Sequence, residues 1–167
     1  MYGDAMNAPF RVGFGYDVHR LEEGLRLTLG GVVVSDDFGC VAHSDGDVLL
    51  HALCDALLGA AGLGDIGMHF PDTDQTYRGI SSLALLHQVA ELLGAAGFQV
   101  GNIDATLLLE RPKIAPFIPA MRAAIAPVLG VQEECVSIKA TTSEALGFVG
   151  EGRGAAAHAV ALIYRNG

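Results

Sequence analysis

Stretches with the periodicity of strands alternate along this chain with stretches that have the periodicity of helices. Within 98–110 every second residue from Ile103 to Leu109 is apolar, as in a strand with one buried face. Within 45–61 and 80–97 leucines recur instead at helical spacing. Such alternation is typical of an α/β layer structure. We therefore expect a two-layer α/β fold with four to five strands and three helices, the helices lying on one face of the sheet.

Turn and capping residues predict where these elements begin and end. Strands are expected at 10–18, 25–34, 98–110, 135–142 and 155–164, the second of them turning back at Gly30 and Gly31. Helices are expected at 45–61, within 80–97, and from Pro116 or Pro119 onward. Ser44 is the expected N-cap of the first helix, and Pro127 should kink or shorten the last turn of the third. Segment 65–79 lacks periodicity and is expected to be a long loop.

A sheet that carries helices on only one face needs cover for the other. The apolar run of Ile103, Ala105 and Leu107 is expected to provide a face that a second subunit could cover. The apolar pattern therefore predicts an oligomer, but it does not give the number of subunits.

The bulk composition limits the class of protein. The chain has 167 residues, of which 51% are hydrophobic and 17% charged, so we expect one domain over 11–167 after an extension at 1–10. No apolar run reaches the roughly 18 residues of a membrane span. A net charge of −9 argues against nucleic-acid binding, which needs a basic surface. Three cysteines without paired spacing, after an N-terminus unlike a signal peptide, favour the cytoplasm.

The stretch GYDVHRL contains two potential metal ligands. Asp17 and His19 are two residues apart in an expected strand, so their side chains should share one face. With His51 from the first helix they would make a two-histidine, one-carboxylate set typical of an open zinc site. Asp47 and Asp55, one turn before and after His51, could orient its ring. The alternative is a core histidine at 51 and a surface pair at 17 and 19.

Two further motifs carry polar groups that suit phosphate. HSDGD, which starts at His43, places a hydroxyl and backbone N–H groups at a helix start, although the motif alone favours a plain capped helix with solvated acids. KATTSE, from Lys139 to Glu144, suits phosphate oxygens and a cation, or is only a strand end with a capped turn. The acidic stretch FPDTD at 70–74 can be nothing more than a turn.

Taken together, GYDVHRL, AHSDGDVLLHALCDALLGAAGLGDIGMHFPDTD, ERPKIAPFIPAMR and KATTSEALGFVGEGRG resemble the 2-C-methyl-D-erythritol 2,4-cyclodiphosphate synthase family. The resemblance extends from about Arg11 to Ile163. It implies a small α/β domain assembled as a homotrimer, with active sites between subunits. It also implies a reaction in which 4-diphosphocytidyl-2-C-methyl-D-erythritol 2-phosphate gives the cyclic 2,4-diphosphate and CMP.

The resemblance also implies roles for individual residues. Asp17, His19 and His51 match the zinc ligands, and Glu144 matches the ligand of a second cation, Mg²⁺ or Mn²⁺. His43 and Thr142 match positions that stabilise the transition state. The implied contacts to the cytidine diphosphate-linked substrate are Ser44, Asp65, Gly67, Phe70, Pro71, Asp72, Asp74, Leu109, Pro112, Lys113, Ile114, Ala115, Thr141, Ser143 and Phe148.

One turn departs from the family pattern. After LGF the family often has Arg and then an acid two residues later, whereas this chain has Glu151 and then Arg153. Those positions belong to an apolar pocket on the trimer axis where isoprenoid diphosphates bind in the family. The reversed order weakens the transfer of that pocket to this chain.

Two other functions would use the same metal ligands. A phosphohydrolase would let a metal-bound water attack, but no general base stands out near the expected ligands, and the cytidine-type loop at Pro112 and Lys113 speaks against it. A non-enzymatic trimer that binds a nucleotide or an isoprenoid would need neither Thr142 nor Glu144. Analysis of the products separates these functions from cyclisation.

Overall fold

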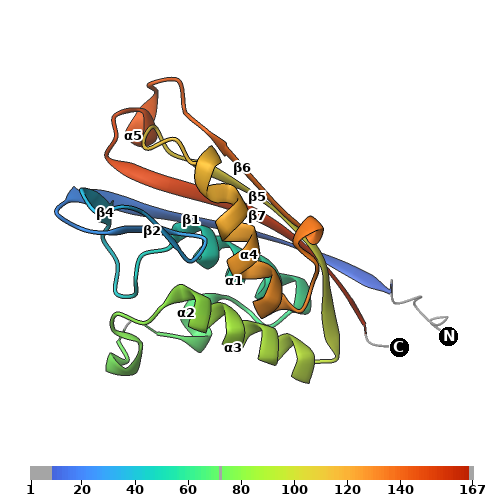
Figure 1. The fold of residues 1–167 in the computed structure, drawn as a ribbon. Helices are drawn as coiled ribbons and strands as arrows, with labels where there is room; N and C mark the ends of the chain where they lie inside the picture. Colours follow the sequence, from blue (N-terminus) through green and yellow to red (C-terminus); the bar gives the residue numbers. More distant parts are fainter. Residues whose placement is uncertain (1–8, 72, 166–167) are drawn as a thin grey trace, which may run out of the picture.

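The computed structural model describes residues 9–71 and 73–165, and it has two layers (Figure 1). A five-stranded mixed sheet with the order β4-β1-β7-β5-β6 forms one layer. Only β5 and β6 are parallel neighbours. The strands are β1 (Phe10–Glu23), β4 (Phe38–Cys40), β5 (Phe98–Leu108), β6 (Val136–Thr141) and β7 (Gly154–Arg165), while β2 (Leu27–Leu29) and β3 (Val32–Ser35) form a separate hairpin that turns at Gly30 and Gly31 as expected.

Helices on one face of the sheet form the second layer, which confirms the α/β prediction (Figure 1). The long helices are α1 (Val48–Ala61), α3 (Ser82–Ala95) and α4 (Ile118–Leu129), and the short ones are α2 (Ile66–His69) and α5 (Gly147–Gly150). Single 3₁₀ turns lie at Gln75–Tyr77, Ala115–Phe117 and Glu133–Cys135. None of the helices in the described part of the chain is long and apolar enough to cross a bilayer.

Several expected boundaries were wrong. Strand β1 continues to Glu23 instead of ending at Val18, and β4 was not expected. Helix α1 starts later than expected because Asp47, rather than Ser44, caps it: the Asp47 carboxylate accepts a hydrogen bond from the Leu50 amide at 3.1 Å. Segment 65–79 contains α2 and a 3₁₀ turn, each started by an aspartate side chain that accepts a backbone N–H. Pro127 lies inside the last turn of α4, which ends at Leu129, and Gly130 caps the helix in the left-handed conformation.

Glycines in β1 let α1 pack closely on the sheet. A Cβ atom at Gly13 would lie 1.9 Å from the carbonyl oxygen of Ala56, and one at Gly15 would lie 1.9 Å from that of Ala52. The adjacent strand β7 presents fully buried alanines to the same helix, namely Ala155, Ala157, Ala159 and Ala161. This close contact fixes the first turn of α1, which carries His51, against the centre of β1.

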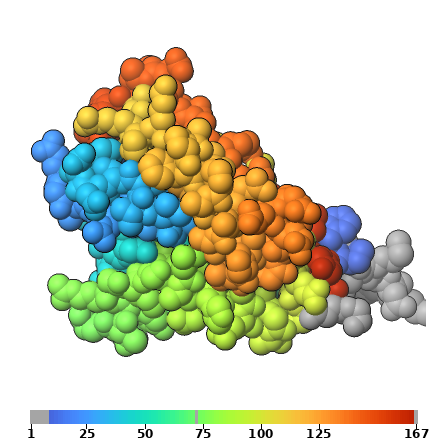
Figure 2. Space-filling model, viewed as in Figure 1, coloured from blue at the N-terminus to red at the C-terminus, as the bar shows by residue number. Residues whose placement is uncertain are grey.

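The β2–β3 hairpin packs into the helical layer. Figure 2 shows it in blue between α4 in orange and the green segment that includes α3. A Cβ atom at Gly30 would meet the side chain of Met121 in α4, and one at Gly31 would meet Leu83 in α3. The fully buried Asp47 carboxylate accepts hydrogen bonds from the Gly30 amide at 3.0 Å and the Gly31 amide at 2.7 Å. Asp47 thus joins the hairpin turn to the start of α1.

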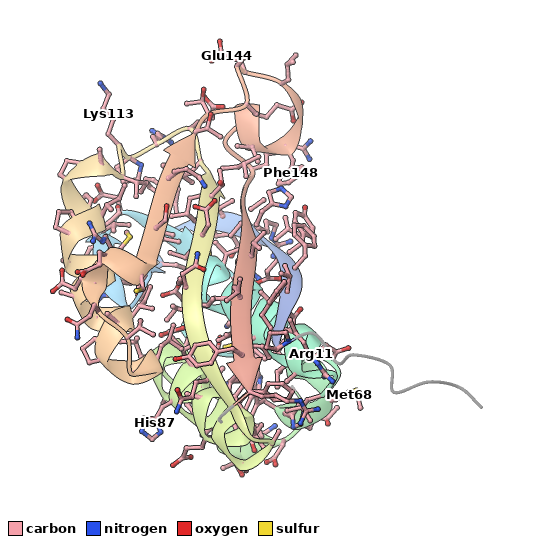
Figure 3. All side chains as sticks on the ribbon, turned by 90° about the vertical axis from the view of Figure 1, so that its right-hand side faces the viewer. Arg11, Met68, His87, Lys113, Glu144 and Phe148 are labelled. Atoms are coloured by element: carbon pink, nitrogen blue, oxygen red, sulfur yellow. The ribbon has the colours of Figure 1, made fainter. Side chains whose placement is uncertain are left out.

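The open face of the sheet is not the one expected from the sequence. Ile103, Ala105 and Leu107 are buried beneath the helices. The exposed apolar side chains come instead from β1, where Val12 is 61% and Phe14 62% exposed, and from β7. Figure 3 looks onto this open face. The prediction that a subunit covers Ile103 to Leu107 was therefore wrong, whereas the homotrimer itself stays a prediction.

The three cysteines should differ sharply in reactivity. All are free; Cys40 and Cys54 are buried and Cys135 is partly exposed. Burial raises the pKa of the Cys40 thiol to about 12 and that of Cys54 higher still, so neither forms thiolate near neutral pH. We expect one thiol per folded chain to react rapidly with a chromogenic disulfide reagent, and three in denaturant. Cys135→Ser should remove the fast phase; rapid reaction of all thiols in the folded protein would contradict the buried positions.

Candidate metal centre and substrate site

Three side chains from β1 and α1 meet in a compact triangle. Asp17 and His19 leave β1 on the side that faces α1, as the period of the strand predicts, and His51 meets them from the first turn of that helix. His19 Nε2 and His51 Nδ1 each lie 3.0 Å from Asp17 Oδ2, and the two nitrogens lie 3.0 Å from each other. The structure therefore confirms that these three residues come together, and it excludes the alternative of an isolated surface pair.

The triangle has the dimensions of a metal-binding site. Tetrahedral zinc with ligand bonds near 2.0–2.1 Å holds its donor atoms about 3.3 Å apart, close to the observed 3.0 Å spacings. Two imidazole nitrogens and one carboxylate oxygen form a donor set suited to a divalent cation. Such a metal would retain a fourth position for a ligand, because the described residues supply three donors at this triangle.

The local electrostatics favour positive charge at the triangle. Burial alone would raise the pKa of the Asp17 carboxyl, but hydrogen bonds from His19 and His51 outweigh burial and hold that pKa well below its usual range. Burial opposes protonation of His51, yet the hydrogen bond to Asp17 and the nearby aspartates raise the pKa of its imidazole. Both shifts arise because the negative charge of Asp17 lies against the imidazoles.

The triangle opens into a cavity of about 390 Å³. Of the residues predicted for the site, Asp17, His19, His43, Ser44, His51, Gly67 and Phe70 line it, and Val41, Ala42, Ile66, Tyr77, Ile80 and Leu85 supply most of the remaining wall. His43 Nε2 is the one buried side-chain nitrogen or oxygen without a hydrogen-bond partner in residues 9–71 and 73–165. A polar ligand in this cavity would satisfy that nitrogen.

A second group of predicted residues lies at the far end of the sheet. Because β5 and β6 are parallel, the loops that follow them meet at one edge, where Figure 3 places Lys113 and Glu144. The Leu109 amide donates to the Thr141 carbonyl at 3.0 Å. Thr142 Oγ1 donates to the Glu144 carboxylate at 3.2 Å. Leu109, Pro112, Lys113, Ile114, Ala115, Thr141, Thr142, Ser143 and Glu144 belong to this group, and none of them lines the cavity of the triangle.

The remaining predicted residues are dispersed. Asp65 is exposed and caps α2 through the Met68 amide, while Asp74 caps the next 3₁₀ turn. Pro71 is exposed beside Phe70, and Asp72 lies outside the described residues. Phe148, in α5, lines a separate hollow with Val18, His19, Arg20, Leu21, Gly152, Arg153 and Gly154. In that turn Arg153 donates to Glu151 at 2.5 Å, so the two residues with reversed order pair with each other.

The expected partners of the His51 ring were wrong. The Asp47 carboxylate is occupied by the backbone amides of the hairpin and α1, and the Asp55 carboxylate accepts from the Ile66 amide at 2.8 Å. The His51 Nε2 atom instead lies 3.1 Å from Ser44 Oγ and 3.0 Å from Ser82 Oγ. Ser82 carried no signal in the sequence beyond its position at a helix start, because it lies 31 residues from His51.

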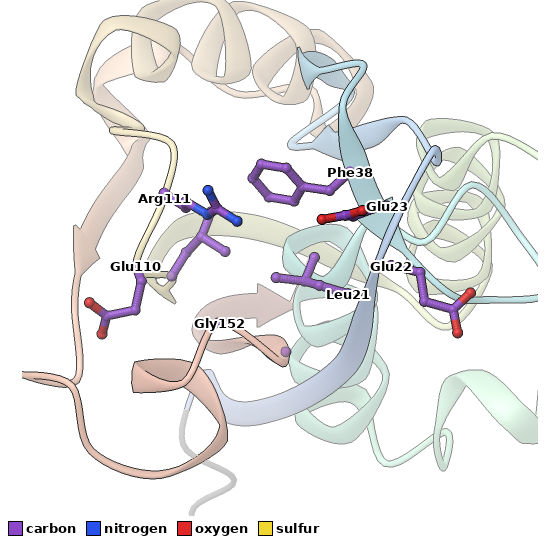
Figure 4. Close-up of a pocket in the computed structure, with 9 residues that line it drawn as sticks. Leu21, Glu22, Glu23, Phe38, Glu110, Arg111 and Gly152 are labelled. Atoms are coloured by element: carbon purple, nitrogen blue, oxygen red, sulfur yellow. The ribbon is translucent and has the colours of Figure 1, made fainter.

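A smaller cavity of about 110 Å³ lies between the end of β1, Phe38 and the loop after β5 (Figure 4). The Arg111 guanidinium stands over the Phe38 ring at 5.2 Å, and Glu22, Glu23 and Glu110 also line the space. At roughly 30 Å³ for each water molecule, this cavity holds a few waters and not a nucleotide. The cavity at the triangle is the candidate substrate site because it contains the three potential metal ligands and the unpartnered Nε2 of His43.

Comparison with known proteins identifies relatives over nearly the whole chain. The sequence profile of the YgbB family matches residues 10–164. A 2-C-methyl-D-erythritol 2,4-cyclodiphosphate synthase from Thioalkalivibrio sulfidiphilus is 60% identical over 93% of this chain and 98% of its own.

Solved structures agree with this match. The bifunctional IspDF from Campylobacter jejuni superposes with a TM-score of 0.91 at 42% identity, over 94% of this chain and 42% of that longer one. The IspF CDP complex from Plasmodium falciparum gives 0.83 at 32% identity, over 95% of this chain and 97% of that one. Because profile, sequence and structure agree over nearly its full length, the chain belongs to the YgbB family of enzymes, the 2-C-methyl-D-erythritol 2,4-cyclodiphosphate synthases.

Proposed function

We propose that this chain converts 4-diphosphocytidyl-2-C-methyl-D-erythritol 2-phosphate into 2-C-methyl-D-erythritol 2,4-cyclodiphosphate and CMP, in a metal-dependent reaction. The observation that carries the proposal is the triangle of Asp17, His19 and His51, open toward a cavity large enough for part of such a substrate. The relative from Thioalkalivibrio sulfidiphilus, 60% identical, is named for this synthase activity.

The proposed metals resolve a conflict of charge. The protein has a net charge of −9, yet two phosphate groups of the substrate must approach each other within it. Asp17, His19 and His51 would hold Zn²⁺, and Glu144 would hold a second divalent cation, Mg²⁺ or Mn²⁺. When bound, the two cations would offset the phosphate charge and orient the β-phosphorus for in-line attack.

The chain's own polar groups act on the reacting phosphates. An oxygen of the substrate's 2-phosphate attacks the β-phosphorus, and the bond from that phosphorus to the oxygen of CMP breaks, so no protein nucleophile is needed. His43, whose buried Nε2 has no partner within the protein, would hydrogen-bond to a phosphoryl oxygen as charge develops on it. Thr142 would act similarly, and Ser44 would contact the 2-phosphate or the erythritol.

The residues near the metal triangle and those at the end of the sheet would contact different parts of the substrate. Asp65 and Gly67 would contact the ribose, and Phe70, Pro71, Asp72 and Asp74 would close over the methylerythritol part. Leu109, Pro112, Lys113, Ile114, Ala115, Thr141 and Ser143 would surround the cytidine, with Phe148 near the same end. A cytidine diphosphate ligand is supported by the Plasmodium falciparum IspF structure, which is a CDP complex.

A homotrimer would bring the two groups together. The residues proposed to surround the cytidine do not line the cavity of the metal triangle in their own chain. A complete site would therefore combine these residues from one subunit with the triangle of a neighbouring subunit. The open apolar face of β1 and β7 provides the surface that such neighbours would cover.

The pairing of Arg153 with Glu151 within one turn gives no support for an isoprenoid diphosphate on the axis of the trimer. The three free cysteines keep the cytoplasm as the predicted location.

Phosphorus NMR of the purified protein, with the cytidyl substrate and Mg²⁺, tests the proposed reaction. Cyclisation predicts two mutually coupled diphosphate resonances and CMP in equal amounts, both lost when a chelator removes the metals. Release of inorganic phosphate would replace the cyclase with a hydrolase. An unchanged spectrum in a protein that retains zinc would overturn the proposal in favour of a binding protein.

A further inference from the structure

We propose that Ser82 and Asp45 are positioning residues for His51, which hold its imidazole at Nε2 so that Nδ1 faces the metal position beside Asp17 and His19. This inference rests on the metal centre of the proposed function and extends it to two residues outside the ligand set. The pair joins α1 to α3 at the site, because Asp45 precedes α1 and Ser82 is the first residue of α3.

Counting protons along the contacts fixes the direction of each hydrogen bond. Ser82 Oγ has a single proton and donates it to Asp45 Oδ1 at 2.5 Å, because an ionised carboxylate can only accept. Toward His51 Nε2, at 3.0 Å, the same oxygen can therefore only accept. An imidazole that binds a metal through Nδ1 carries its proton on Nε2, and Ser82 Oγ is placed to accept that proton while Nδ1 faces Asp17 and His19.

The pair is held rigidly in place. Ser82 is fully buried at 0% exposure, and its backbone amide donates to Asp45 Oδ2 at 2.9 Å. The Asp45 carboxylate thus accepts hydrogen bonds from both the amide and the hydroxyl of Ser82. The Asp45 amide in turn donates to the Ile80 carbonyl at 3.1 Å. Because three hydrogen bonds link the two segments, the Ser82 oxygen has little freedom to move away from the imidazole.

Ser44 does not replace this arrangement. Its hydroxyl also lies 3.1 Å from His51 Nε2, and it accepts from the Gly46 amide at 3.2 Å. Ser44 lines the substrate cavity, however, and among residues 9–71 and 73–165 no carboxylate accepts its proton as Asp45 does for Ser82. Ser82, by contrast, is absent from the cavity wall. Ser44 is therefore available to contact the substrate, whereas Ser82 orients the His51 ring.

Metal ligands of this type lose about 10–100-fold in metal affinity when their outer hydrogen-bond partner is removed. We therefore expect Ser82→Ala to weaken zinc binding by about that factor, measured on the full chain by competition with a chromogenic chelator. In ¹H–¹⁵N spectra of the zinc-loaded protein, the His51 Nε2–H resonance should be protected from solvent exchange in the wild type and broadened or lost in Ser82→Ala. Ser82→Thr, which keeps the hydroxyl, should restore both the affinity and the protected resonance.

Ser81→Ala is the matched control, because Ser81 is exposed and its side chain makes no capping hydrogen bond to α3. It should change neither readout. If Ser82→Ala does not fold, Asp45→Asn tests the same pair; its amide can donate as well as accept, so Ser82 is no longer held as an acceptor and both readouts should change in the same direction. Wild-type zinc affinity with an unchanged His51 Nε2–H resonance in a folded Ser82→Ala or Asp45→Asn protein would overturn the proposal. These readouts do not involve turnover, so failure of the cyclisation assay would leave the result standing.

Discussion

Replacing His51 with alanine is expected to weaken zinc binding by roughly a hundredfold and to abolish turnover with it. The substitution removes one corner of a triangle whose three donor atoms are mutually 3.0 Å apart, and two protein ligands remain. If the roughly 10–16 kcal/mol of zinc binding is shared among four ligands, one ligand contributes about 3 kcal/mol, or roughly a hundredfold in affinity. Zinc content after gel filtration and the rate of CMP formation measure the two effects.

His87→Ala is the control for this experiment. His87 also lies on a helix, but it is exposed and is not part of the metal triangle. Its loss should leave zinc content and rate unchanged. The thermal unfolding of His51→Ala must also be compared in metal-free protein, so that loss of metal is not confused with loss of fold. Full zinc and full activity in His51→Ala would show that the ligand assignment is wrong.

The metal triangle could be predicted from sequence because each part of it depends on local geometry. The period of a strand places Asp17 and His19 on one face whatever surrounds the strand. The helical segment around His51 is similarly evident from its leucines. Only the meeting of the two elements required the fold, and the motifs shared with the family supplied that expectation.

The open sheet face could not be assigned in this way, because β1 has an unusual buried face. Its buried positions include Gly13 and Gly15, which resemble interruptions of a strand when they are met in sequence. They are buried because α1 approaches so closely that no side chain fits between the helix and the strand. The large apolar residues of β1, such as Phe14, therefore point to the opposite side, away from the helices.

The surroundings of His51 were missed for a different reason. Helical spacing correctly places Asp47 and Asp55 near His51, but their carboxylates bind backbone amides of the hairpin and of α2. A backbone N–H with no other partner competes for a carboxylate as effectively as a histidine ring does. Sequence spacing gives proximity within one helix, whereas the choice of partner depends on segments that only the fold brings close.

Glu144→Gln is expected to separate metal binding from catalysis. Glu144 lies at the end of the sheet where Figure 3 labels it, and it is not part of the metal triangle, so zinc content should remain at the wild-type level. Its carboxylate is the proposed ligand of the second cation, and a neutral amide binds a divalent cation much less well. If that cation supplies about 3 kcal/mol of transition-state stabilisation, the rate of CMP formation should fall by roughly a hundredfold.

The dependence on Mg²⁺ tells whether Glu144 acts through a cation. Loss of a cation ligand should raise the Mg²⁺ concentration required for half-maximal rate, so added Mg²⁺ should recover part of the activity of Glu144→Gln. Glu134→Gln, a change at an exposed glutamate in the turn before β6, should have the wild-type rate and Mg²⁺ dependence. A Glu144→Gln protein with wild-type rate at limiting Mg²⁺ would exclude this ligand. A slow variant with unaltered Mg²⁺ dependence would show that Glu144 acts without a cation. Its role would then be to orient the Thr142 hydroxyl, which donates a hydrogen bond to the Glu144 carboxylate at 3.2 Å.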